Sequence, residues 1–96
     1  MKRKKSVLVD DMEHCVICGR EAVNLHHVLF GNFGSGRKHS DQDGYVIPLC
    51  HNHHTGKEGI HFNKDLSDWW KRAAQRHFEQ ARSRKEFIER YGRSYL

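Results

Sequence analysis

Cysteine and histidine side chains are the chemically distinctive feature of this sequence. The 96 residues include three cysteines and nine histidines, and the histidines concentrate between His26 and His61. An odd number of cysteines argues against a closed disulfide framework. Cysteines and histidines that occur together are typical metal ligands in a reducing compartment. The sequence therefore predicts metal binding.

Two ligand pairs have the spacing of a structural zinc site. Cys15 and Cys18 are separated by two residues, and so are Cys50 and His53, with 31 residues between the pairs. A two-residue gap directs two ligands to one point, both in a tight turn and on a helix, so the four close a tetrahedral site. His51 and His54 are alternatives for the fourth ligand. The competing interpretation is a set of buried free cysteines with a surface histidine, which leaves a small polar chain without a stabilising metal.

Further histidines remain once the zinc site has its four ligands. His26 and His27 are adjacent on a predicted strand, so their side chains point to opposite faces and are expected to have different roles. His54 follows a zinc ligand and turns towards a neighbouring element. One histidine of the adjacent pair can hold a divalent cation together with His54. The other can then accept a proton from water, a division that suits phosphodiester hydrolysis. The alternative is that these histidines are structural.

These motifs resemble the zinc-stapled HNH endonucleases. The matching residues are Leu25–Val28 and, after a loop, Ile47–Thr55, and the similarity extends over residues 14–62. The chain is similar in particular to small phage and prophage members and to the nuclease domain of recombination-enhancement proteins. In that family the first histidine of the pair is a metal ligand and the second is the general base. The resemblance thus implies that His26 binds the catalytic metal and that His27 activates water.

The same resemblance supplies further roles. It implies that His54 completes the catalytic metal site and that His61, in Gly59-Ile60-His61, is a third ligand. Two positions depart from the family pattern. Tyr45 stands where many members have an asparagine that ties the loop, so Asn32 or a backbone carbonyl is needed to orient His27. The second zinc pair ends in His53 rather than a cysteine.

The implied activity is that of a metal-dependent DNA endonuclease or nickase that leaves 5′-phosphate ends. The cofactors would be a structural Zn²⁺ and a catalytic Mg²⁺, Mn²⁺ or Ni²⁺. The alternative is a non-catalytic zinc module that binds nucleic acid or a protein partner. The net charge of +5 and the pI of about 9.3 suit a polyanionic partner. Arg37 and Lys38, in a glycine-rich segment beside the site, are the expected phosphate contacts.

The elements that must position these residues follow from periodicity and turn chemistry. Residues 23–30 and 45–49 read as strands, and the glycine-rich residues 31–44 between them as a loop. A short helix is expected over residues 50–57. A long helix with Asn63 as its cap is expected over residues 64–81, and its apolar stripe places Trp69 and Trp70 in the core. Ser83 opens a capping box for a last helix that ends near Gly92.

The predicted fold class is α+β: a small ββα-metal domain with a structural zinc and a C-terminal helical tail. A single domain is expected, with a basic arm at residues 1–13, a zinc-stapled core at 14–62 and a helical extension at 63–96. No apolar run approaches the ~20 residues of a membrane span. We therefore expect DNA as the partner, no membrane association, and a cytoplasmic protein, phage-encoded in the host if the resemblance holds. A homodimer and a larger phage recombination or packaging assembly are both compatible with so short a chain.

Overall fold

Two short antiparallel strands form the centre of the structure. β1 spans Asn24–His27 and β2 spans Val46–Leu49, with Leu25 opposite Pro48 and His26 opposite Ile47. The computed structural model describes residues 5–29, 35–57 and 59–96. Within these ranges the chain is a small mixed α/β structure with one two-stranded sheet and four α-helices. Both strands were predicted, and each is shorter than the predicted range.

The connection between the strands contains a helix, so the expected loop over residues 31–44 is wrong for most of its length. Helix α1 spans Ser35–Asp43, while residues 30–34 lie outside the described part. The buried Ser40 hydroxyl donates to the carbonyl of Tyr45 and accepts from the backbone N–H of Leu29. Gly44, at φ +79°, ends the helix in the left-handed conformation that glycine adopts without strain. The sequence of this segment is polar and contains glycine, so it does not indicate a helix. The tertiary contacts of Ser40 stabilise the helix.

Two short helical segments follow β2 and bring histidines together. Helix α2 spans His51–His54 and begins directly after Cys50, and the 3₁₀ helix η1 spans Ile60–Phe62. A Cβ atom at Gly59 would collide with the carbonyl oxygen of His54, so only glycine permits this close approach. The expected helix over residues 50–57 is therefore confirmed in position but is shorter.

The two C-terminal helices agree with the sequence prediction. Helix α3 spans Lys64–Glu79, and the Asn63 side chain accepts a hydrogen bond of 3.1 Å from the backbone of Leu66. Helix α4 spans Arg84–Tyr91, with Ser83 as its N-cap and Gly92 in the left-handed conformation at its end. The cap residues set both helix boundaries, as such residues do in general.

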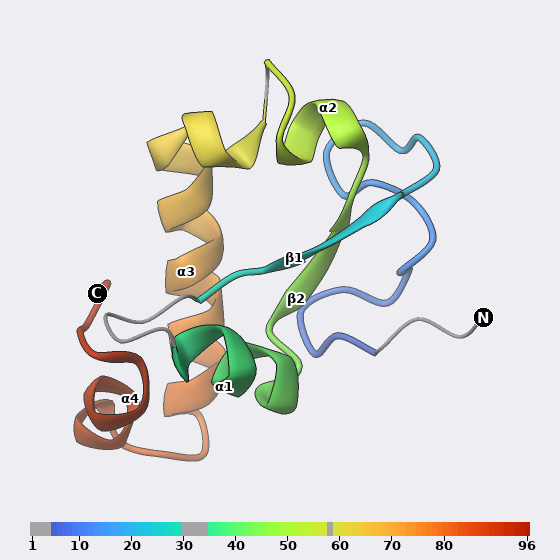
Figure 1. Cartoon of the computed structure of the whole chain (residues 1–96). Helices are drawn as coiled ribbons and strands as arrows, with labels where there is room; N and C mark the ends of the chain where they lie inside the picture. Colours follow the sequence, from blue (N-terminus) through green and yellow to red (C-terminus); the bar gives the residue numbers. More distant parts are fainter. Residues whose placement is uncertain (1–4, 30–34, 58) are drawn as a thin grey trace.

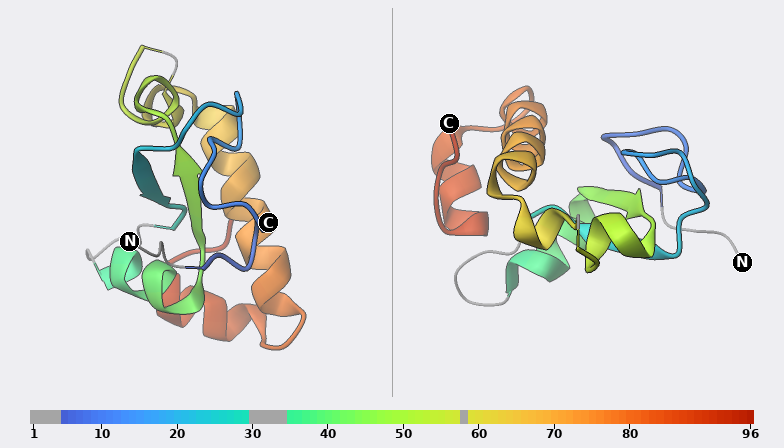
Figure 2. Two further views of the ribbon diagram at one scale, coloured as in Figure 1. Left: turned by 90° about the vertical axis from the view of Figure 1, so that its right-hand side faces the viewer. Right: turned by 90° about the horizontal axis from the view of Figure 1, so that it is seen from above.

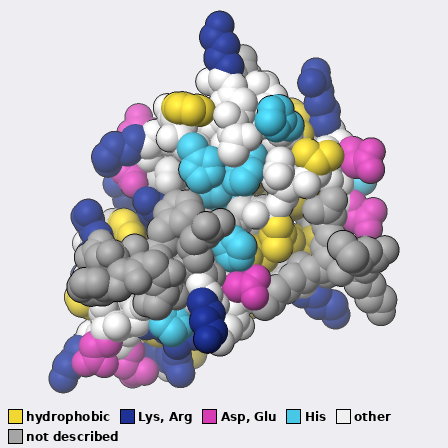
Figure 3. All heavy atoms as spheres, viewed as in Figure 1, with side chains coloured by type: hydrophobic (Ala, Val, Ile, Leu, Met, Phe, Trp, Pro, Cys, Tyr) yellow, Lys and Arg dark blue, Asp and Glu magenta, His cyan; other side chains and the backbone are white. Residues whose placement is uncertain are grey.

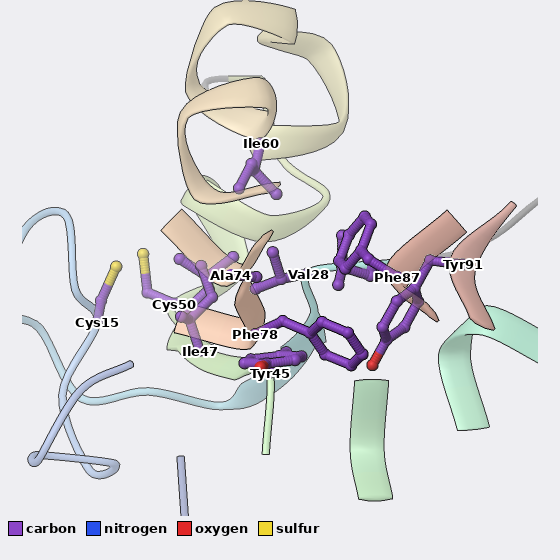
Figure 4. Packing of buried hydrophobic residues seen from close by; sticks show 12 residues of the cluster. Cys15, Val28, Tyr45, Ile47, Cys50, Ile60, Ala74, Phe78, Phe87 and Tyr91 are labelled. Carbon is purple, nitrogen blue, oxygen red and sulfur yellow. The ribbon is translucent and has the colours of Figure 1, made fainter. Parts of the chain in front are cut away.

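The hydrophobic core joins β2 to the two C-terminal helices. Phe78 from α3 packs edge-on against Phe87 from α4 at 5.3 Å between ring centroids, and Tyr91 lies beside both (Figure 4). Trp70 packs against this cluster, but Trp69 is 57% exposed, so its expected place in the core is wrong. The fully buried members of the cluster include Leu29, Ile47, Leu49, Phe87 and Tyr91.

The N-terminal segment covers the other side of the sheet from α3. Figures 1 and 2 show the strands between α3 and this segment, which leads to the first cysteine pair. The backbone N–H of Val7 donates to the carbonyl of Gly44, and Leu8 and Val9 pack against the core. The expected arm at residues 1–13 therefore contacts the rest of the structure through Val7, Leu8 and Val9, and its first four residues lie outside the described part.

Candidate metal centres

The first candidate metal centre is built from a turn and the start of a helix. Cys15 and Cys18 lie in a tight turn that the left-handed Gly19, at φ +78°, closes with a backbone hydrogen bond to Cys15. Cys50 and His53 lie at the N-cap and third residue of α2. The turn is held beside β2 by a hydrogen bond from the backbone of Val16 to Pro48. Figure 4 shows the sulfur atoms of Cys15 and Cys50 side by side.

The spacing of the four ligand atoms fits a tetrahedral zinc ion. The Cys18 and Cys50 sulfurs are 3.7 Å apart, and His53 Nδ1 lies 3.2 Å from the sulfur of Cys50 and 3.8 Å from that of Cys15. In a tetrahedral site, zinc–ligand bonds of about 2.0–2.3 Å imply ligand-to-ligand distances of about 3.3–3.8 Å, close to those found here. A disulfide would need about 2.05 Å between sulfurs. The group Cys15, Cys18, Cys50 and His53 is therefore positioned to bind a metal ion.

The structure distinguishes among the neighbouring histidines of α2. His53 points to the cysteines, whereas His54 points to a different group, and His51 is exposed. Successive residues on a helix are rotated by about 100°, which accounts for the divergence of His53 and His54.

Local backbone donors favour the thiolate form of Cys15. Burial alone raises the pKa of this thiol, but the backbone N–H groups of Cys50, Cys18 and Ile17 outweigh burial and bring it below its ordinary value. The thiolate is the form that binds a metal. The backbone of this centre thus supports metal binding as well as placing the ligands.

The second group consists of three histidines from three elements. His26 comes from β1, His54 from α2 and His61 from η1, and their ring centroids lie 5.3, 5.1 and 4.8 Å apart. One nitrogen from each ring lies within 4.8 Å of the others. Figure 3 shows histidine side chains gathered at the centre of one face of the molecule. The cluster is open on the side of His61, which is exposed, and closed at His26, which is 2% exposed.

The environment keeps His26 neutral. Burial lowers the pKa of this imidazole, and the positive charges that His54, His61, His27 and Lys71 carry when protonated lower it further, to about 3. A neutral imidazole keeps a lone pair for a cation, so three converging imidazoles suit a divalent metal of the borderline class. Of the three catalytic cations that the sequence motif implies, this donor set fits Ni²⁺ best and Mg²⁺ least, because Mg²⁺ prefers oxygen ligands.

His27 points away from this cluster and has a carboxylate partner. Its Nε2 lies 3.3 Å from Oδ1 of Asp41, a residue of α1, and the His27 side chain is 22% exposed. Sequence reasoning missed Asp41 because the segment that carries it was expected to be a loop. The run of polar residues before Gly44 was the available sequence signal for this helix.

The remaining predicted site residues lie in different places. Lys38 is exposed on α1, and the side chain of Arg37 lies outside the described part, as does Asn32. Tyr45 is buried, and its hydroxyl pairs with Nδ1 of His77 at 3.1 Å. The structure therefore pairs His27 with Asp41, whereas Tyr45 is engaged with α3.

Comparisons with known proteins do not identify a relative of this chain. No family model matches the chain, and no curated protein or solved structure is significantly similar to it. None of the helices in the described residues combines the length and apolar character that a membrane crossing requires.

Proposed function

We propose that this chain is a metal-dependent endonuclease of the HNH kind that hydrolyses phosphodiester bonds in DNA, with a ββα-metal core stapled by zinc. One observation carries the proposal. Adjacent residues of β1 turn to two environments: His26 joins two other histidines, and His27 pairs with a carboxylate. A cation site and a separate base within one residue of each other are what metal-assisted hydrolysis requires.

His27 would serve as the general base. The N–H at Nε2 donates to Asp41, which leaves the lone pair of Nδ1 to accept a proton from water. The water oxygen forms a bond to phosphorus, and the bond from phosphorus to the 3′-oxygen breaks. The departing oxygen takes a proton from solvent, so the products are a 3′-hydroxyl and a 5′-phosphate.

His26, His54 and His61 would hold the catalytic cation. A bound Mg²⁺, Mn²⁺ or Ni²⁺ supplies positive charge to the phosphate oxygens and to the leaving oxygen. The three side chains come from β1, α2 and η1, so the fold of this region, rather than one element, sets their geometry. The zinc centre would fix α2 against the turn that carries Cys15 and thereby place His54.

Plasmid cleavage tests the proposal. The zinc-loaded protein is incubated with supercoiled plasmid and Mg²⁺, Mn²⁺ or Ni²⁺, beside His27→Ala and the control His51→Ala, whose side chain is exposed and belongs to neither ligand group. We expect cleavage by wild type and His51→Ala, and a loss of 10²-fold or more in His27→Ala, about the contribution of a general base. Absence of cleavage with all three metals, or equal cleavage by His27→Ala, would reject the enzyme and leave a zinc module that binds nucleic acid or a protein partner.

A further inference from the structure

A basic pocket opens beside the histidine cluster. It has a volume of about 680 Å³ and lies where η1, α3 and the segment after α4 meet. This volume is in the range of pockets that bind small organic ligands. The residues that define its character are His61, Lys64, Lys71, Arg72, Arg93 and Tyr95.

Positive charge dominates the walls of this pocket. Four of its lining residues are lysines or arginines, against the single carboxylate of Asp68. Lys64 pairs with Asp68 at 2.6 Å, and the lining as a whole carries more cations than acids. Such a concentration of one charge favours an anionic occupant.

Two of these cations lie against the ring of Tyr95. Lys71 Nζ lies 5.2 Å and Arg93 Cζ 5.1 Å from the centre of the ring, and the Arg72 side chain donates to the Tyr95 carbonyl at 3.4 Å. Burial lowers the pKa of Lys71; Asp68 opposes this effect, while Lys64 and Arg93 add to it. Cations crowded in this way repel one another, and a bound anion relieves the repulsion.

The pocket is continuous with the histidine cluster. His61 lines the pocket, and its ring centroid is 5.1 Å from that of His26. The charge of Lys71 also reaches His26, since it lowers the pKa of that imidazole. A chain of phosphates that crosses the cluster would therefore place its neighbouring phosphate in the pocket.

An aromatic side chain at the rim favours an unpaired strand. Phe62 lines the pocket and is 75% exposed, which is unusual for so large an apolar residue. Basic grooves with exposed aromatic rings bind single strands, because a base outside a duplex can stack on the ring. A duplex keeps its bases stacked inside and offers only phosphates to a concave pocket.

We propose that this pocket binds the unpaired nucleotides next to the scissile phosphate, so that the substrate is DNA with a single-stranded segment. Lys71, Arg72 and Arg93 would contact phosphates, and Phe62 would stack on a base. The proposal rests on the endonuclease function for the identity of the scissile phosphate. The binding of a single strand does not depend on cleavage.

Fluorescence anisotropy measures the binding of a single strand separately from cleavage. A dye-labelled oligothymidine of 12 nucleotides and a mixed-sequence duplex of 12 base pairs are titrated with zinc-loaded protein, without Mg²⁺, Mn²⁺ or Ni²⁺. We expect the single strand to bind at least about tenfold more tightly. Lys71→Gln, which removes the charge but keeps a flexible polar side chain, and Arg93→Ala should each lower affinity several-fold and reduce the salt slope by about 0.7. Phe62→Ala should lower the affinity for the single strand about fivefold or more.

Matched controls lie outside the pocket. Lys85→Ala removes an exposed cation from α4, and Ile88→Ala removes an exposed apolar side chain from the same helix. Neither should change affinity by more than about twofold, and equal thermal midpoints for all variants verify folding. Equal binding of duplex and single strand, pocket variants that match the controls, or equal competition by polyglutamate would overturn the proposal.

The failure of this proposal is distinguishable from the failure of the enzyme. If His27→Ala abolishes cleavage while the pocket variants bind and cleave like wild type, the nuclease stands and the pocket proposal falls. If no metal supports cleavage but the single strand still binds through Lys71 and Phe62, the pocket proposal stands and the nuclease falls.

Discussion

The Nε2 atom of His27 lies 3.3 Å from Oδ1 of Asp41, across the gap between β1 and α1. This contact orients the imidazole, and an ionised Asp41 would hold its proton on Nε2. In the proposed mechanism, a carboxylate in this position would also stabilise the imidazolium that forms when His27 accepts a proton. The relationship leads to the first prediction.

Asp41→Asn should lower kcat for plasmid cleavage by about 10- to 100-fold and leave KM within about twofold, since general-base efficiency depends on position and charge. Asp41→Glu should recover part of the loss. Cleavage kinetics with Mn²⁺ provide the measurement, and Glu89→Gln, an exposed change on α4, is the matched control. A KM effect without a kcat effect would mean that Asp41 does not act through His27.

His53→Ala should abolish stoichiometric zinc binding, while His51→Ala should retain about one zinc per chain. The first change removes a ligand whose Nδ1 lies 3.2 Å from the Cys50 sulfur, and the second removes an exposed side chain of the same helix. Because metal binding free energy adds to folding free energy, His53→Ala and chelation should also lower the thermal midpoint. Elemental analysis and thermal unfolding test both effects. Equal zinc content in the two variants would show that His53 is not a ligand.

The free energy of unfolding should fall as the pH falls from about 6.5 towards 3, in part because of His26. Its folded pKa is about 3 against an ordinary value of 6.5, so the unfolded chain binds more protons in this window. The contribution lost at pH 5 is about 2 kcal/mol. Urea unfolding at pH 7 and pH 5 measures the loss. His26→Gln should show a loss that is smaller by that amount, and an identical pH dependence in both proteins would contradict the assignment.

Tyr91→Phe should destabilise the protein by about 1.5–3 kcal/mol, the usual value of a buried hydrogen bond to a charged group. The Tyr91 hydroxyl donates to Oδ2 of Asp43 at 2.6 Å, and the same carboxylate accepts from Arg90 at 2.7 Å. The control is Tyr95→Phe, whose hydroxyl lies in a partly exposed site and which should change stability by less than about 0.5 kcal/mol. Urea unfolding at pH 7 gives both values. If the two substitutions cost the same, the bond to Asp43 does not hold α1 against α4.

Local signals in the sequence were sufficient for the C-terminal half of the fold. Asn63 and Ser83 act as N-caps, and Gly92 ends α4, because these residues satisfy or terminate a helix through contacts within a few positions. The antiparallel strands were likewise expected from their apolar and β-branched residues. The cysteine and histidine spacing predicted the four residues that the structure places at the first metal centre.

Long-range contacts determined what the sequence did not reveal. Helix α1 is held by Arg90 and Tyr91, which are 47 and 48 residues from Asp43, and no local pattern reports such partners. The partnership of Asp41 with His27 was hidden for the same reason. Trp69 is exposed although it belongs to the apolar stripe of α3, because a stripe inferred from periodicity is wider than the face of the helix that is finally covered.

His53 and His54 are consecutive residues of one four-residue helix, yet they belong to two different ligand groups. An ion bound by the first group would restrain His53 and, through the shared helix, His54, so part of the ordering that a second ion requires would already be in place. The two metals would therefore bind with positive cooperativity, and by thermodynamic reciprocity each would raise the affinity of the other by the same factor. In a cell short of zinc, this coupling would lower the affinity of the histidine cluster for its cation, although none of its three side chains has changed.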